Sequence, residues 1–253
     1  MTPPPPHSPA VLWPQFILAA ALERMGRDHA DGSRSGETLC YVDTHAGGGR
    51  IAPPMPHLSR VLDRRDGFLS QAFFAAVTRV PADWGYPGSW VLAAEALAAI
   101  PVEYEIDIND LSDAAIEQAR QNQRIGRIRY WCHDWFKFLR SRLTMLRPPH
   151  FVFIDPPHDS DGASLAMDAA ILLDTLKIPY MATYATEAQD ETIDLIGRTA
   201  LELTWGRDRT TGVILGGGAE RVALRLLRDL ELLAECLDGQ FLIRTPHNDD
   251  FII

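Results

Sequence analysis

Asp155 is the acid best placed to do chemistry, because it directly follows the apolar run Phe151 to Ile154 and precedes Pro156 and Pro157. A continuous run of aromatic and β-branched residues is typical of a central strand covered on both faces, and two prolines stop such a strand. Asp155 is therefore expected at the carboxyl end of a strand, where ligands bind in open α/β sheets. Held there by a rigid turn, its carboxylate could meet a substrate. The alternative is an ordinary Asp-Pro turn.

A second candidate group is the segment Asp43 to Arg50 (DTHAGGGR), which follows the predicted strand Leu39 to Val42. Its glycines at 47, 48 and 49 let the backbone turn sharply and come close to a ligand. A phosphate-binding loop must open directly into a helix N-terminus, and the prolines at 53, 54 and 56 forbid that here. The segment therefore favours a ligand without phosphate over a dinucleotide, with a plain tight turn as the alternative.

Further acids stand where two other predicted strands end. Asp107 lies near the end of the strand Tyr104 to Ile108, where a carboxylate can accept both ribose hydroxyls of an adenosine-containing cofactor. The alternative is a turn before the helix Asp113 to Gln123, although Ser112 is already a candidate cap for that helix. Asp134 follows the strand Arg129 to Cys132. It could bind a ligand at that strand end or, equally well, cap the next helix.

The elements that position these residues alternate along the chain, which predicts a mostly parallel sheet with helices on both faces. Ser89 is expected to cap one of the helices. A Pro-rich tail at 1–9 is expected to be disordered. The predicted helices are 10–31, 58–77, 90–100, 113–123, 136–146, 165–176, 191–199 and 220–237, and the predicted strands are 39–42, 104–108, 129–132, 151–154, 178–184, 201–205 and 212–215.

Composition limits the classes of function. The chain has 253 residues, a hydrophobic content of 46% and a net charge of −10. This negative charge speaks against a protein that binds nucleic acid over its whole surface. The segment Arg124 to Arg147 is an exception, since it holds several arginines and one acid; a solvated helix face would explain it equally well. Cys40, Cys132 and Cys236 are expected to be buried reduced thiols in a cytoplasmic protein, and no metal-ligand spacing appears. The apolar run 16–22 is too short to span a membrane.

Two of these motifs together resemble the bacterial 23S ribosomal RNA adenine-N6 methyltransferases of the J type, in the class I S-adenosylmethionine-dependent superfamily. Tyr41 to Arg50 (YVDTHAGGGR) looks like that family's first cofactor motif, and Ile154 to Pro157 (IDPP) looks like its catalytic motif. Similar motifs recur in the same order between about residues 10 and 245, namely Tyr86 to Ser89 (YPGS), Asp107, Asp134 with Trp135 and Phe136, and Thr211 to Ile214 (TGVI).

The resemblance implies a Rossmann-like class I methyltransferase fold: a mostly parallel seven-stranded sheet, helices on both faces, and a small helical insertion at about 51–88 within one domain, 10–253. It implies that Asp155 and the carbonyl of Pro156 accept hydrogen bonds from an exocyclic amine, aiming its lone pair at the methyl group. His158 stands where the family has tyrosine and would stack on the base. The residues implied for S-adenosylmethionine are Asp43, His45, Gly47, Gly49, Ser89, Asp107, Asp134, Trp135 and Asp155.

These observations predict an S-adenosylmethionine-dependent N-methyltransferase of an exocyclic amine, with adenine N6 in RNA as the favoured acceptor. Two alternatives remain: a methyltransferase of a small-molecule amine, which the acidic composition favours, and a methyltransferase-like binding module without catalysis. A monomer without membrane attachment is expected. RNA would contact the basic segment Arg124 to Arg147.

Overall fold

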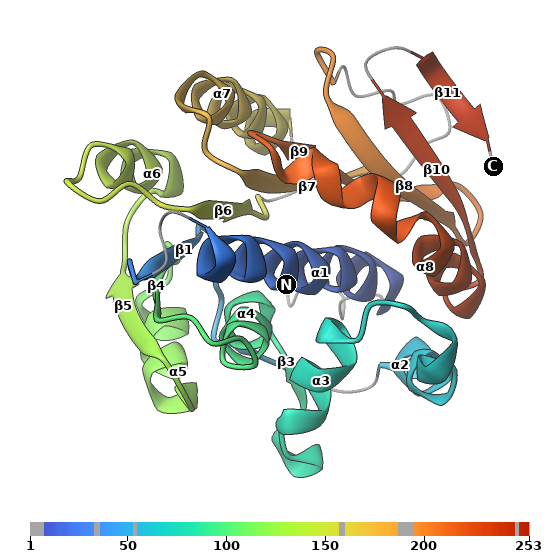
Figure 1. The fold of residues 1–253 in the computed structure, drawn as a ribbon, viewed down its shortest axis with the longest axis horizontal. Helices are drawn as coiled ribbons and strands as arrows, with labels where there is room; N and C mark the ends of the chain where they lie inside the picture. The colour runs from blue at the N-terminus through green and yellow to red at the C-terminus, as the bar shows by residue number, and fades with distance from the viewer. Residues whose placement is uncertain are drawn as a thin grey trace.

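The core of the molecule is a nine-stranded sheet with the strand order β11-β10-β8-β9-β7-β6-β1-β4-β5 (Figure 1). The structure, a computed structural model, describes residues 8–32, 36–52, 55–156, 160–186, 195–245 and 248–252. The strands of this sheet are β1 (Leu39–Asp43), β4 (Tyr104–Asn109), β5 (Arg127–Trp131), β6 (Phe151–Ile154), β7 (Tyr180–Thr186), β8 (Thr199–Trp205), β9 (Arg209–Gly216), β10 (Gly239–Thr245) and β11 (Asn248–Ile252).

The strands from β5 through β7 pair in parallel, whereas β9, β8, β10 and β11 continue the sheet as antiparallel neighbours. Numbered in chain order, the parallel strands are arranged 3-2-1-4-5, as in doubly wound α/β folds. All seven predicted strands form. The predicted strand count is nevertheless wrong, because β10 and β11 extend the sheet after the last predicted helix.

Helices cover both faces of the sheet, and side-chain alternation along the central strands explains why the predicted runs are continuously apolar. Phe151 and Phe153 of β6 join a core with α1, α4 and α8, whereas Val152 and Ile154 join a second core with α6 and α7. The helices are α1 (Ser8–Asp31), α2 (Pro56–Asp63), α3 (Ala72–Arg79), α4 (Ser89–Leu97), α5 (Asp113–Asn122), α6 (Trp135–Leu143), α7 (Ser160–Leu176) and α8 (Ala223–Cys236).

The insertion packs into the helical layer beside α1. It begins and ends at the short antiparallel pair β2 (Arg50–Ile51) and β3 (Tyr86–Pro87). Phe16 of α1 contacts Phe68 and Phe73 of the insertion, with ring centroids 5.3 and 5.6 Å apart. The buried Asp229 carboxylate of α8 accepts the backbone N–H groups of Leu69 and Ser70 at 2.8 and 2.7 Å. The single predicted helix 58–77 is therefore broken into α2, a 3-10 turn at Arg65–Gly67, and α3.

Three further predictions need correction or lie outside the described residues. Helix α1 begins at Ser8, inside the predicted tail 1–9, of which residues 1–7 are not described. Of the predicted helix 191–199, residues 191–194 are not described and 195–198 are not helical. All three cysteines are free, but Cys132 is half-exposed rather than buried. No helix in the described part of the chain is both long and apolar enough to cross a bilayer.

Candidate active site at the carboxyl ends of β1 and β6

The candidate site lies where β1 and β6 run side by side and each leads to an acid. Asp43 is the last residue of β1, and Asp155 directly follows β6. The register pairs Asp43 with Phe153, so Asp155 lies two residues beyond that level. From β1 the chain adds β4 and β5 on one side of the sheet and then β6 and β7 on the other side. The strand order therefore reverses between β1 and β6. Ligands bind in the crevice at such a point in open α/β sheets.

Asp43 is a buried carboxyl with three donors around it. The Ser89 hydroxyl donates to Oδ2 at 2.6 Å, the Tyr41 hydroxyl donates to Oδ2 at 3.3 Å, and the His45 backbone N–H donates to Oδ1 at 3.2 Å. Burial, together with the charge of Asp155, raises the pKa of Asp43 to about 7 against the opposing effect of these hydrogen bonds. The carboxyl therefore changes between its neutral and ionised forms near pH 7, and a cation bound beside it would favour the ionised form.

Asp155 is exposed at the rim and held from one side. Thr183 of β7 donates a short hydrogen bond from its hydroxyl to Asp155 Oδ1. Oδ2 makes no hydrogen bond to the described residues. Pro156 is buried directly after it, whereas His158 lies outside the described residues.

The glycine loop turns between β1 and β2 and has one open side. Gly47 has φ +57° and donates its N–H to Asp110 Oδ2 at 3.0 Å. A Cβ placed on Gly47 would meet nothing within 4 Å, whereas one on Gly49 would lie 2.3 Å from the Trp90 ring. Gly49 is thus required for packing on α4, and Gly47 borders open space. As predicted, the loop does not run into a helix; it enters β2, which lacks the N-terminal donors that hold phosphate.

His45 lies at the centre of the rim. Its Nδ1 is 2.8 Å from the Thr44 hydroxyl oxygen, and its ring is 5.1 Å from that of Trp135. Its Nε2 is buried without a hydrogen-bond partner in the described part of the chain. Burial lowers the pKa of His45 to about 4, although the carboxylates of Asp155, Asp110 and Asp134 pull in the opposite direction. His45 is therefore neutral at physiological pH.

Asp110 is a rim residue that the sequence interpretation treated only as part of a turn. It follows the last residue of β4 and accepts two backbone N–H groups, those of Gly47 at 3.0 Å and Ser112 at 2.8 Å. Its position two residues after the predicted strand Tyr104 to Ile108 was the available signal. The contact with Gly47 spans 63 residues and is visible only in the folded chain.

Asp107 does not reach the rim, contrary to its predicted role as a ribose ligand. It is fully buried, and both of its oxygens are occupied by the guanidinium groups of Arg129, at 2.6 and 2.7 Å, and Arg142, at 2.6 Å. Trp131 Nε1 adds a bond at 3.0 Å. Burial raises the pKa of Asp107, but the hydrogen bonds from the two arginines outweigh it and hold the pKa below its usual value.

Two predicted helix caps have different outcomes. Ser89 is not a cap, because α4 has Gly88 at that position and the Ser89 hydroxyl bonds Asp43 instead. Asp134 does cap α6, since its Oδ1 accepts the Lys137 N–H at 2.9 Å. Trp135, the first residue of α6, then contacts His45. The fold thus brings Asp43, His45, Gly47, Ser89, Asp134, Trp135 and Asp155 to this rim, and leaves Asp107 in the interior.

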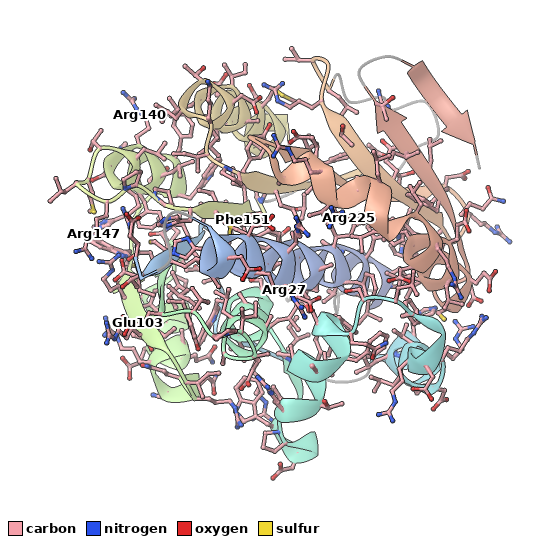
Figure 2. All side chains as sticks on the ribbon, viewed as in Figure 1. Arg27, Glu103, Arg140, Arg147, Phe151 and Arg225 are labelled. Atoms are coloured by element: carbon pink, nitrogen blue, oxygen red, sulfur yellow. The ribbon has the colours of Figure 1, made fainter. Side chains whose placement is uncertain are left out.

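The basic segment 124–147 is divided between structural and exposed cations. Arg124, Arg129 and Arg142 pair with the carboxylates of Glu95, Asp107 and Glu105. By contrast, Arg127, Lys137, Arg140 and Arg147 are exposed and form no ion pair with the described residues. Figure 2 shows Arg140 and Arg147 beside α6 at the edge of the molecule.

A groove of about 450 Å³ follows α6 away from Asp134, and one of these exposed cations, Lys137, lines it. Its lining combines aromatic, polar and apolar side chains, namely Trp131, His133, Asp134, Lys137, Phe138, Ser141 and Met145. No group of three or more His, Cys, Asp or Glu side chains suited to a metal ion is found among the described residues.

Comparison with solved structures shows a similar fold in the Legionella pneumophila protein LPL1258, of the family DUF519. The TM-score is 0.67 at 15% identity, covering 91% of this chain and 96% of that one. A Listeria monocytogenes protein named as a class I S-adenosylmethionine-dependent methyltransferase has a TM-score of 0.42 at 13% identity, covering 87% and 70%. The methylase-named Haemophilus influenzae protein HI0767 has 0.41 at 13%, covering 71% and 80%. The last two likenesses are too weak to bear on function. No protein-family model and no curated protein matches the sequence.

Proposed function

We propose that this protein is an S-adenosylmethionine-dependent N-methyltransferase that acts on an exocyclic amine, with adenine N6 in RNA as the favoured acceptor. The observation that carries the proposal is the meeting of Asp43 and Asp155 at the carboxyl ends of adjacent parallel strands, beside a glycine loop unsuited to phosphate. The aspartates at 110, 134 and 155 make the rim negative. Such a site suits a cationic ligand.

The described residues fit this cofactor. Its sulfonium and ammonium groups are cations, and it supplies an electrophilic methyl group when bound. The open side of Gly47 admits a ligand next to the backbone, and the nearly neutral carboxyl of Asp43 would ionise against a cation. Asp110, rather than Asp107, is placed to accept ribose hydroxyls, because Asp107 has no oxygen to spare. Asp134 would accept a hydrogen bond from the amine of the cofactor's adenine, and Trp135 would cover the adenine ring by apolar contact.

Asp155 would orient the acceptor amine. Its Oδ1 is held by Thr183, so Oδ2 is the oxygen that would accept an N–H from the amine, with the Pro156 carbonyl as second acceptor and His158 as a stacking wall. The amine becomes cationic as it is methylated, so a fixed carboxylate stabilises the transition state more than the ground state. This is catalysis by positioning and electrostatics, without a covalent intermediate.

RNA is favoured over a small amine by the surface next to this rim. The groove along α6 starts at Asp134 and combines the aromatic rings of Trp131 and Phe138 with Lys137, while Arg140 and Arg147 are exposed nearby. Rings and cations in one groove are how proteins bind single-stranded nucleic acid without reading its sequence. The proposed footprint is therefore narrower than the whole basic segment, because its paired arginines serve the fold.

The test combines calorimetry with methyl transfer from labelled S-adenosylmethionine to unmodified ribosomal RNA and, separately, to a pool of small amines. We expect the wild type to bind the cofactor and to methylate the RNA. Asp155→Ala should lower kcat by about 10² to 10³-fold, the loss seen when one fixed electrostatic contact is removed, with cofactor affinity within a few fold. Thr183→Val, which frees Oδ1, should lower kcat less. If methyl groups are transferred only to the small amines, a small amine and not RNA is the acceptor. If the protein binds the cofactor but transfers no methyl group, it is a binding module that has lost catalysis.

A further inference from the structure

Two acceptors lie within reach of the single hydrogen on the Thr44 hydroxyl. Thr44 Oγ1 is 2.8 Å from His45 Nδ1 and 3.1 Å from the carbonyl oxygen of Phe153, which also accepts the Thr44 N–H at 3.1 Å. When the hydroxyl donates to Phe153, it accepts from His45. The imidazole proton is then on Nδ1, and Nε2 carries a bare lone pair. We take this tautomer for the inference below, and the first test measures it.

That lone pair is enclosed and has no donor among the described residues. A buried acceptor without a partner is unfavourable, and a ligand bound at this rim would supply the missing donor. The charged groups acting on the ring are Asp155 after β6, Asp110 after β4 and Asp134 at the start of α6, and all three are acids. The ring nevertheless stays neutral, because burial outweighs their pull.

The same hydrogen bonds fix His45 relative to the catalytic acid proposed above. The Thr44 hydroxyl and the Thr44 N–H both bond the carbonyl of Phe153, each at 3.1 Å. Phe153 precedes Asp155 by two residues on the same strand end. The loop that carries His45 is thus fastened to the strand that carries Asp155, and Asp155 is the charge with the largest effect on the ring.

We propose that His45 Nε2, in place of the Pro156 carbonyl, accepts the second N–H of the amine that is methylated and then takes the proton that this amine releases. The inference rests on the proposed function and adds a catalytic residue to it. The amine nitrogen forms a bond to the methyl carbon with its lone pair, while the sulfur–methyl bond breaks and leaves its electron pair on sulfur. One N–H proton of the resulting cation passes to Nε2. A neutral methylated amine and an imidazolium remain, and the imidazolium returns its proton to water.

This role selects a class of acceptor. A ring that protonates only near pH 4 is a weak base and takes a proton only from a strongly acidic cation. An aliphatic ammonium, with a pKa of about 10.4 as in lysine, would keep its proton. An exocyclic amine conjugated with an aromatic ring gives a far more acidic cation on methylation, and that proton can pass to His45. Proton transfer to His45 therefore has a use for an aromatic exocyclic amine, whereas methylation of an aliphatic amine would proceed without it.

The first test reads the proton position without any reaction. Nitrogen NMR of the full chain labelled with ¹⁵N-histidine, assigned with His45→Asn, should show a protonated Nδ1 and an unprotonated Nε2 for His45 at pH 7. A proton on Nε2, or a ring already charged at pH 6, would overturn the inference.

The second test uses two variants that each keep one side of the ring. His45→Asn retains a donor near Nδ1 for Thr44 and removes the Nε2 acceptor, whereas His45→Gln places an amide oxygen near Nε2 that can accept a hydrogen bond but not a proton. We expect kcat on unmodified ribosomal RNA to fall about 10² to 10³-fold in His45→Asn and less in His45→Gln, with cofactor affinity within about threefold. A wild-type kcat in His45→Asn would overturn the inference and leave the proposed function standing. A wild type that binds no cofactor in calorimetry would instead remove both.

Discussion

Ser89 and Asp43 are 46 residues apart in sequence, and the Ser89 hydroxyl donates a 2.6 Å hydrogen bond to Asp43 Oδ2. The bond joins the first residue of α4 to the last residue of β1. It lowers the pKa of a carboxyl that burial raises to about 7. The protonation state of Asp43 near neutral pH therefore depends on Ser89.

Removing that bond should shift the pH dependence of cofactor binding. The ionised form of Asp43 favours a cationic ligand, so wild-type affinity for S-adenosylmethionine should rise as the pH increases through about 7. Ser89→Ala raises the pKa of Asp43 further and should move this rise to higher pH. Calorimetry between pH 6 and pH 8.5 measures both curves. Ser112→Ala is the matched control: it removes the cap of α5, bonded to Ala115 N at 3.2 Å, and should cost about 1 kcal/mol of stability without moving the curve.

The raised pKa of Asp43 also predicts how stability depends on pH. Its folded pKa, about 7, lies above the unfolded value of 3.8, so the folded state holds a proton that the unfolded state has lost in between. This contribution is fully present below pH 3.8 and is lost as the pH rises through about 7. Asp43→Asn cannot ionise, so its free energy of unfolding relative to wild type should be more favourable at pH 8 than at pH 5. Urea unfolding at both values checks this; the exposed Asp208→Asn should show no such difference.

Asp107 should matter for stability and not for cofactor contact. Asp107→Ala leaves the fully buried guanidinium of Arg142 without its carboxylate, which costs about 3–5 kcal/mol. The double variant Asp107→Leu with Arg142→Met should recover most of this loss and bind S-adenosylmethionine within a few fold of wild type. Glu105→Ala removes one carboxylate partner of the half-exposed Arg129, which keeps Asp107, and should cost under about 1 kcal/mol. A folded double variant without cofactor affinity would reinstate Asp107 as a ribose ligand.

The salt dependence of RNA binding should identify the exposed cations that contact phosphate. Each lost contact with a single strand reduces the slope of log K against log salt by about 0.7. Arg140→Ala and Arg147→Ala should each lower the slope by about that amount, because both side chains are exposed next to the groove along α6. Arg225→Ala, an exposed arginine on α8 in the opposite helical layer, should leave the slope unchanged. Equal effects of all three variants would argue against a local footprint.

Local pattern was sufficient to predict the central strands and the acids at their ends. Strands β1 and β6 are apolar runs because both faces of the sheet are covered, and Asp43 and Asp155 follow from where those runs stop. The sequence also predicted the glycine loop and showed that the loop is unsuited to phosphate, since the prolines after it prevent a helix from starting directly at the loop. Strand β10 was not anticipated, although it pairs with β8 over six positions, because a strand that leaves a helix directly carries little local turn signal.

The partners of the polar side chains were decided by the tertiary structure. Asp107 and Asp110 are both acids near the end of β4, yet the first is saturated by Arg129 and Arg142, and the second reaches Gly47 at the rim. Their difference arises because side chains alternate across a strand, and because α6 brings Arg142 from 35 residues away onto one face. The Thr44 hydroxyl beside His45 likewise meets the carbonyl of Phe153, which lies 109 residues from Thr44 and becomes its neighbour only when β1 and β6 pair.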